Sequence, residues 1–145
     1  MAAKIQKTVK TQKITNKKAK TAPKATKRSE VSTGKIFVSA TFNNTIVTIT
    51  DEKGNTLSWG SSGRAGFKGT RKSTPYAATT AVETAIKKAK EDFGLKQVSV
   101  FIKGPGPGRD AALRAIRSTG IRMDQIADIT PIPHNGPRAK KKRRA

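Results

Sequence analysis

The stretch from Lys103 to Asp110 alternates three glycines with two prolines, between a strand-like run and a helix-like run. Residues 98–102 are typical of a strand, and residues 110–119 carry apolar side chains at the spacing of a helix. Because proline fixes φ and glycine allows a close approach of backbone, the segment predicts a rigid turn that opens a helix. Such a turn can present backbone amides to an anion, or it can serve only as a stiff connector.

The body of the chain alternates strand-like and helix-like segments. Strands are predicted over residues 36–41, 46–50, 56–60, 98–102 and 126–130, and helices over residues 75–92 and 110–119. Ser73 or Thr74 can cap the first helix before Pro75, and Gly94 ends it. The order βββαβαβ predicts an α/β fold with a mixed five-stranded sheet that begins as an antiparallel meander. Because a helix lies in each later crossover, we expect strands three and four, and strands four and five, to be parallel neighbours.

The charge of +22 is concentrated at the two ends of the chain. Residues 1–28 hold ten basic side chains and residues 134–145 hold six, with no acidic one in either segment. We therefore divide the chain into a basic N-terminal arm (1–33), a globular α/β domain (34–133) and a basic C-terminal tail (134–145). Segments of like charge bury little apolar surface, so both extensions are expected to be disordered until they meet a polyanion. Nucleic acid is the partner that this composition favours.

Several classes of protein are disfavoured by what the chain lacks. It has no cysteine, which removes disulfides and thiolate chemistry and suits the cytoplasm. It has no apolar run of about 18 residues, so no membrane partner is expected. Its carboxylates lie in predicted loops and on helix exteriors rather than in a cluster, which disfavours a metal-dependent nuclease. No cofactor or small-molecule substrate is expected, and an organellar transit peptide remains a minor alternative for the arm.

The glycine-proline turn does not have the spacing of a nucleotide site. A P-loop requires Gly-Lys-Ser/Thr after four intervening residues, and a dinucleotide fingerprint requires two residues between its last glycines, where Pro107 stands alone. Two alternatives remain for the turn. It is either a stiff connector or a contact to a phosphate backbone made by the turn amides, Lys103 and Arg109.

Two further segments carry residue types that suit RNA. The loop at residues 63–72 combines glycines and Phe67 with four basic side chains, Arg64, Lys68, Arg71 and Lys72. Phe67 can stack on a base, or it can anchor the loop in the core. The Asn43-Asn44 turn can contact a base or sugar edge, or it can be simple turn chemistry.

The C-terminal tail supplies the remaining candidates for contacts with RNA. These are His134, Asn135, Arg138, Lys140, Lys141, Lys142, Arg143 and Arg144. His134, the only histidine, cannot form a metal site alone and suits stacking or phosphate contact instead. Asn135 precedes Gly136, and this pair is prone to succinimide formation, so we expect isoaspartate at Asn135.

Four motifs in the same order give the chain a resemblance to a known family. They span residues 40–51, 66–75, 103–109 and 128–136. From Gly34 to Arg144 the chain resembles the eleventh protein of the small ribosomal subunit (ribosomal protein S-eleven), of the bacterial rather than the eukaryotic cytosolic type. The resemblance implies a ribonuclease H-like mixed sheet without nuclease activity. It also implies a place on the subunit platform, bound to 16S-type rRNA, beside other platform proteins and near the exit path of mRNA.

The resemblance also transfers residues. It implies RNA contacts at Asn43, Asn44, Lys68, Arg71, Lys72, Arg109, His134, Asn135 and Arg138, and isoaspartate at Asn135. One departure is that many bacterial members have Cys-Arg-Pro-Pro after the His-Asn-Gly, where this chain has residues 137–140, Pro-Arg-Ala-Lys. The leading hypothesis is a ribosome-bound structural protein of the cytoplasm that supports subunit assembly and translation. The alternatives are a free nucleic-acid-binding protein of the nucleoid type and a degenerate ribonuclease H-like enzyme.

Overall fold

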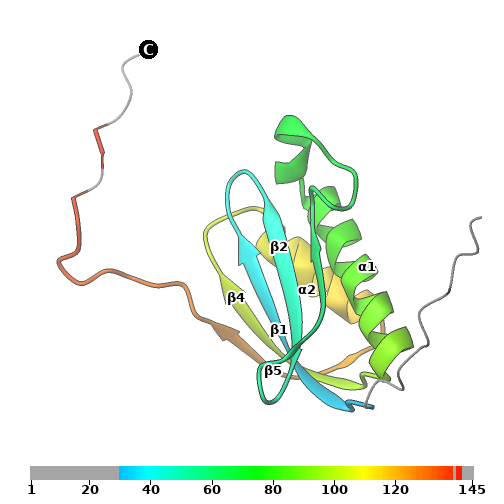
Figure 1. Cartoon of the computed structure of the whole chain (residues 1–145). Coiled ribbons are helices and arrows are strands. Elements are labelled where there is room, and N and C mark those ends of the chain that lie inside the picture. Colours follow the sequence, from blue (N-terminus) through cyan, green and yellow to red (C-terminus); the bar gives the residue numbers. More distant parts are fainter. Residues whose placement is uncertain (1–29, 139, 142–145) are drawn as a thin grey trace, which may run out of the picture.

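Five strands and two α-helices follow one another in the predicted order in a computed structural model that describes residues 30–138, 140 and 141. The elements are β1 (Thr33–Ala40), β2 (Thr45–Asp51), β3 (Thr56–Ser61), the 3-10 helix η1 (Gly69–Ser73), α1 (Pro75–Phe93), β4 (Gln97–Lys103), α2 (Gly108–Ser118) and β5 (Arg122–Asp128). The predicted α/β class, a mixed five-stranded sheet with two helices, is confirmed (Figure 1). Most of the predicted arm lies outside the described residues, as do Lys142, Arg143 and Arg144.

The strands are ordered β3-β2-β1-β4-β5 across the sheet. The first three strands form the predicted antiparallel meander, and β4 and β5 are parallel neighbours as expected. The expectation that the third and fourth strands are neighbours is wrong, because β4 pairs in parallel with β1. Since β1 and β3 run in the same direction, a right-handed crossover could reach either of them. Pairing with β1 places apolar β4 inside the sheet and leaves β3, whose inward residues are Ser58 and Gly60, at the edge.

Both helices pack on one face of the sheet (Figure 1). α1 covers β2 and β3, α2 lies against β1, and the helices contact each other. α1 buries a face of mostly small side chains, formed by Ala77, Ala78, Ala81, Val82, Ala85, Ile86 and Ala89. Small side chains let the backbones come close: a Cβ atom on Gly60 would lie 2.6 Å from the carbonyl oxygen of Ala81. The core therefore lies between this helix pair and the inward side chains of β1, β2 and β4.

The ends of the first helix follow the predicted capping residues. The Thr74 hydroxyl accepts a hydrogen bond from the Ala77 amide at 3.3 Å, and Pro75 is the first helical residue. Gly94 ends the helix in the left-handed region, with φ of 71°. The second helix begins at Gly108, two residues before the predicted start.

The last strand and the long loop differ from the sequence prediction for physical reasons. The last strand starts at Arg122 rather than at residue 126, because its pairing with β4 begins directly after α2 at Gln97–Arg122. A register shift between Val98 and Ser99 leaves this edge strand without a clean alternation of apolar and polar side chains. The loop expected to be irregular contains η1, whose last turn is closed by a hydrogen bond from the Ser73 hydroxyl to the Thr70 carbonyl oxygen at 2.6 Å.

Candidate nucleic-acid interface

The predicted RNA-contact segments emerge at one end of the sheet. Because β1, β4 and β5 are parallel, their carboxyl ends lie at the same edge, where the antiparallel β2 begins. We call this the loop end, and it comprises residues 41–44, 62–74, 104–107 and the chain that leaves β5 after residue 128. In Figure 1 the turn between β1 and β2 and the loop before α1 lie together at the top of the domain. The fold thus brings together motifs that are far apart in sequence.

The glycines of the glycine-proline turn let it lie directly on the end of β1. The Gly106 amide donates to the Ala40 carbonyl oxygen at 2.9 Å, and the Gly104 amide donates to Thr130 Oγ1 at 3.1 Å. A Cβ atom would lie 2.3 Å from the Ala40 oxygen at Gly104 and 2.2 Å from the Thr41 oxygen at Gly106. Both amides are used within the chain, so the geometry favours the stiff connector over an amide cradle for an anion. Lys103 is exposed beside the turn.

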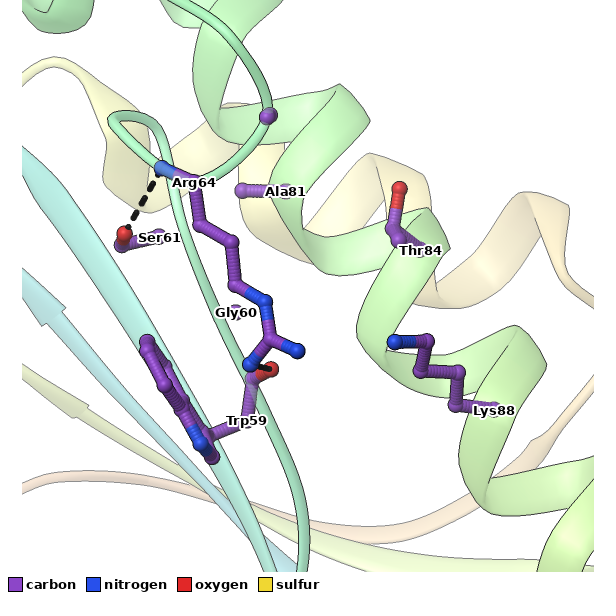
Figure 2. Close-up of a pocket in the computed structure, with 8 residues that line it drawn as sticks. Trp59, Gly60, Ser61, Arg64, Ala81, Thr84 and Lys88 are labelled. Atoms are coloured by element: carbon purple, nitrogen blue, oxygen red, sulfur yellow. Dashed lines mark hydrogen bonds between the residues drawn. The ribbon is translucent and has the colours of Figure 1, made fainter. Parts of the chain in front are cut away.

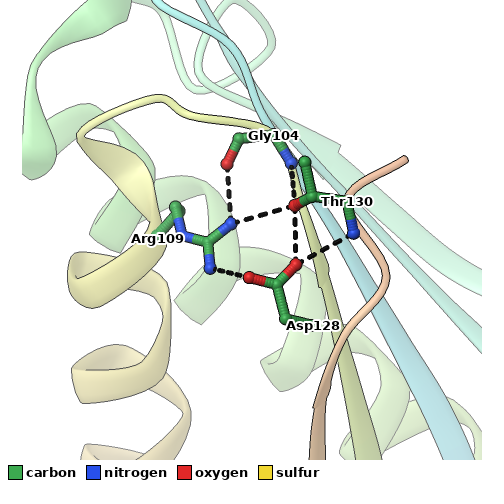
Figure 3. Close-up of polar contacts among 4 residues, drawn as sticks. All are labelled: Gly104, Arg109, Asp128 and Thr130. Carbon is green, nitrogen blue, oxygen red and sulfur yellow. Dashed lines mark hydrogen bonds and ion pairs between the residues drawn. The ribbon is translucent and has the colours of Figure 1, made fainter. Parts of the chain in front are cut away.

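Arg109 joins this turn to the end of β5 (Figure 3). Its Nη1 atom donates to the Gly104 carbonyl oxygen at 2.7 Å and to Thr130 Oγ1 at 3.3 Å, and its Nη2 atom pairs with Asp128. Asp128 Oδ1 accepts from the Thr130 amide at 2.9 Å and from the Thr130 hydroxyl at 2.6 Å. The bond from Arg109, followed by those from Thr130, holds the pKa of Asp128 well below its ordinary value of 3.8.

Arg64 turns back from the long loop onto β3 (Figure 2). Its guanidinium carbon lies 4.3 Å from the centroid of a Trp59 ring, and its Nη1 atom donates to the Trp59 carbonyl oxygen at 3.4 Å. The backbone amide of Arg64 donates to Ser61 Oγ at 3.1 Å. Arg64 also lines a groove of about 210 Å³ between β3 and α1, together with Trp59, Gly60, Ser61, Ala65, Ala81, Thr84 and Lys88. No sequence pattern signals this contact, because the alternation around Trp59 indicates only a strand residue.

The rest of the long loop presents cations around an aromatic pair. The Phe67 ring is half-buried and meets the exposed Tyr76 ring edge-on, with 5.8 Å between centroids. The contact holds the loop against the first turn of α1, outside the buried core, so base stacking and anchoring in the core both stay predictions for Phe67. Lys68 and Arg71 are exposed and Lys72 is half-buried.

The Asn43-Asn44 turn has strong local hydrogen bonding. The Thr41 hydroxyl accepts from the Asn44 amide at 3.1 Å and donates to the Asn44 carbonyl oxygen at 2.9 Å. This pattern fixes the turn without the Asn43 side chain, which is exposed, as is Phe42. Asn43 is therefore available for an outside contact, while Asn44 is half-buried.

Acidic side chains are concentrated away from the loop end. All nine lie in the described part of the chain, and six of them flank the opposite end of the sheet or the end of α1: Glu30, Asp51, Glu52, Glu91, Asp92 and Asp124. Glu83 lies midway along α1. Asp110 and Asp128 lie at the loop end, where Asp128 is paired with Arg109. The loop end is therefore the cationic end of the domain.

The tail continues this cationic surface away from the domain (Figure 1). His134, Asn135, Arg138, Lys140 and Lys141 are all exposed. Within the described residues, Asn135 is the one non-glycine residue with positive φ, at 53°. Across the same residues, no group of three or more His, Asp or Glu side chains is placed to hold a metal ion. None of the helices in the described ranges has the length and apolar character to span a bilayer.

The fold and this end define a small basic α/β protein that presents glycine-rich loops and a cationic tail at one edge of its sheet. The chain belongs to the ribosomal protein S11 family, because the family model described as Ribosomal protein S11 matches residues 34–144. That match includes the domain and nearly all of the tail. The family is structural and non-enzymatic, which confirms the expectation that the chain is not an enzyme.

Curated relatives agree with the family model. The small ribosomal subunit protein uS11 of Psychromonas ingrahamii is 56% identical over 128 residues, which cover 87% of this chain and 98% of that protein. The protein of the same name from Chromobacterium violaceum is 57% identical over 129 residues, covering 88% and 98%. That from Halorhodospira halophila is 59% identical over 114 residues, covering 79% and 86%. The resemblance to the bacterial type is therefore confirmed.

Proposed function

We propose that this protein is a structural constituent of the small ribosomal subunit that binds 16S-type rRNA through its loop end and its C-terminal tail. The observation that carries the proposal is the family match across residues 34–144. Two relatives, each matched over 98% of its own length, are named as small-subunit proteins. The separation of charge within the domain supports the same function, because clustered Lys and Arg side chains bind phosphates by releasing counterions.

The proposed contacts have two kinds of chemistry. Lys68, Arg71 and Lys103 are exposed at the loop end and suit phosphate oxygens. Asn43 and His134 are exposed as well and can contact a base or sugar edge. Arg109 is already bonded inside the domain, so its main role is to hold the turn in place beside Lys103.

The finer position follows from the resemblance. We expect the protein to lie on the subunit platform, beside other platform proteins and near the mRNA exit (Shine-Dalgarno) region, in cytoplasmic ribosomes. There it would support assembly of the subunit and translation. The cationic loop end and tail support a position against rRNA, because Lys and Arg side chains bind its phosphates.

Sedimentation of a cell extract tests the proposal. The protein should travel with small subunits when low magnesium separates the two subunits, and it should leave them only at high salt. A free nucleic-acid-binding protein of the nucleoid type would stay off the ribosomal fractions and follow the DNA. Finding the protein in the DNA fraction, or in the large-subunit peak, would contradict the proposal.

A further inference from the structure

The face of the sheet opposite the helices carries a row of aromatic side chains. Strand register places Trp59 on β3, Thr48 on β2, Phe37 on β1, Phe101 on β4 and Ala127 on β5 side by side in one cross-strand row. Both helices lie on the other face (Figure 1). We call this the open face. The core lies on the other face of the sheet, so it does not account for three aromatic side chains in one row here.

Phe37 and Phe101 form a stacked pair of rings in the middle of this row. Their ring centroids are 5.2 Å apart and their planes differ by 17°, so the two rings stack on each other from neighbouring strands. Thr48 follows Phe37 on one side and Ala127 follows Phe101 on the other, and both are small. The stacked pair therefore has a shallow space on each side, one over Thr48 and one over Ala127.

Trp59 closes one of these spaces. Its side chain lies two strands from Phe37, which corresponds to about 10 Å at a strand spacing of roughly 4.8 Å. A planar group between two rings needs a contact of about 3.5 Å on each side, so there is room for one. Arg64 covers the face of the Trp59 ring nearer α1, and this leaves the second ring face for another group (Figure 2). Trp59 is 51% exposed, which is high for so large an apolar side chain.

The charge on the open face favours nucleic acid as the occupant. Its strand residues include Lys35 and Lys103, on opposite sides of the aromatic row, and Arg64 lies over Trp59. Arg122 on β5 lies beside Gln97 at the far end of this face, where its Nε atom is 3.3 Å from Asp124 Oδ1. Ser39, Ser61, Ser99 and Gln125 are neutral. The rings and the two nearest strand positions in this row carry no carboxylate, and Lys103 and Arg64 lie beside them, which matches a chain of planar bases joined by phosphates.

We propose that the space over Thr48, between Trp59 and Phe37, receives an unpaired RNA base by stacking, while Lys103 and Arg64 contact the adjoining phosphates. This inference rests on the proposed function, because it needs an RNA partner. It adds a base-stacking site to a protein whose other candidate contacts are mainly to phosphate. It also gives Trp59 and the Phe37–Phe101 pair a use that the core does not require.

Trp59 is the only tryptophan of the chain, so its fluorescence reports on this site directly. The full-length protein is titrated with a single-stranded 12-nucleotide RNA and with an abasic ribose-phosphate polymer of the same length. Both polymers should bind through the cationic tail, but only the RNA should quench Trp59 emission. The RNA should also bind more tightly, by roughly five-fold to about a hundred-fold, which is the range for one stacked base.

Two variants test the site by opposite changes. Trp59→Ser removes a stacking ring, while Thr48→Phe fills the space and leaves Trp59 in place. Both should reduce the preference for RNA over the abasic polymer to about one, with binding of the abasic polymer unchanged. Ile126→Ser is the matched control, because Ile126 is 54% exposed but lies on the helix side of β5, and it should keep the preference.

The outcomes separate this inference from the proposed function. Equal binding of the two polymers by the unchanged protein, or quenching that persists in Thr48→Phe, would overturn the stacking site. The protein could then still travel with small subunits, and the open face would be left to a protein neighbour. If the unchanged protein bound neither polymer, that result would contradict the proposed function and the inference together.

Discussion

Asp128 holds the exit of β5 against the glycine-proline turn through Arg109 and Thr130. Asp128→Asn should lower the thermal midpoint at neutral pH, because it leaves the Arg109 guanidinium without its charged partner. The pKa of Asp128 is lower in the folded chain, so its carboxylate stabilises the fold above the ordinary value of 3.8. That contribution is lost as the pH falls below this value. The difference between wild type and variant should therefore shrink toward about pH 2 in thermal melts.

A second carboxylate on the same strand provides the control. Asp124 lies 3.3 Å from Arg122 in an exposed pair, and such pairs contribute little to stability. Asp124→Asn should therefore change the thermal midpoint far less than Asp128→Asn. Equal effects of the two substitutions would mean that the Arg109–Asp128 contact has no special part in holding β5.

Asn135 is the residue for which the sequence predicts a chemical change. The following Gly136 has no side chain to hinder attack by its nitrogen on the Asn135 side-chain carbonyl carbon. Ammonia leaves, and water then opens the succinimide to isoaspartate. Peptide mapping of protein from native subunits should show isoaspartate at this position, and Gly136→Ala should slow its formation. Unmodified asparagine in fresh and aged material alike would contradict the prediction.

Arg109 shows what a sequence can and cannot say about one residue. Its place in a glycine-rich turn predicted a contact to phosphate, but the structure pairs it with Asp128, 19 residues further on. No local pattern marks such a partner, because the pairing depends on β5 lying beside β4. The exposed Lys103, by contrast, was assigned from the same turn and remains open to solvent.

The glycine-proline turn is the element whose packing depends most directly on residue type. Gly106 has no positive φ, so only space limits a substitution there. A Cβ atom would lie 2.2 Å from the Thr41 oxygen, which is backbone and cannot move aside. Gly106→Ala should therefore destabilise the domain by about 1–3 kcal/mol or more, as overpacking does, in denaturant unfolding.

Gly63 is the matched control for this substitution. A Cβ atom there would meet the Lys72 side chain at 3.6 Å, an ordinary contact. Gly63→Ala should leave the unfolding midpoint nearly unchanged. If Gly106→Ala were equally harmless, the turn could not be seated on the end of β1 as described.

At the level of elements, local sequence patterns predicted which helices and strands form better than they predicted which strands are neighbours. The alanine stripe and capping residues of α1 were correctly predicted, because both depend on neighbouring residues. The neighbours of β4 were not, since β1 and β3 have the same direction and choosing between them depends on the whole sheet. The start of β5 was also missed, because an edge strand exposes both faces of its first residues.

The whole molecule is organised by the separation of charge along the sheet. The sequence showed that the body is only moderately basic, with fifteen basic residues against nine acidic ones over residues 29–133. It could not show that most of the acidic residues lie away from the loop end, because this follows from the strand directions. The candidate loops were identified singly, and the fold brings them to one edge.

Removing residues 137–145 should weaken RNA binding mainly by loss of charge. The truncation deletes six basic side chains: Arg138, Lys140, Lys141, Lys142, Arg143 and Arg144. If all six contact phosphates of single-stranded RNA, the slope of log affinity against log salt should fall in magnitude by about 4. Incorporation into small subunits should fall as well. An unchanged salt slope would count against a role for the tail in binding.

The orientation of the domain is tested most directly by the reactivity of its lysines toward an acetylating reagent, before and after assembly into small subunits. Lys68 and Lys103 at the loop end, with Lys140 and Lys141 in the tail, should become protected in the subunit. Lys53 lies in the turn between β2 and β3 and Lys96 precedes β4, both at the opposite end, and they should stay more reactive. Protection of Lys53 and Lys96 with continued reactivity at Lys68 and Lys103 would contradict the account.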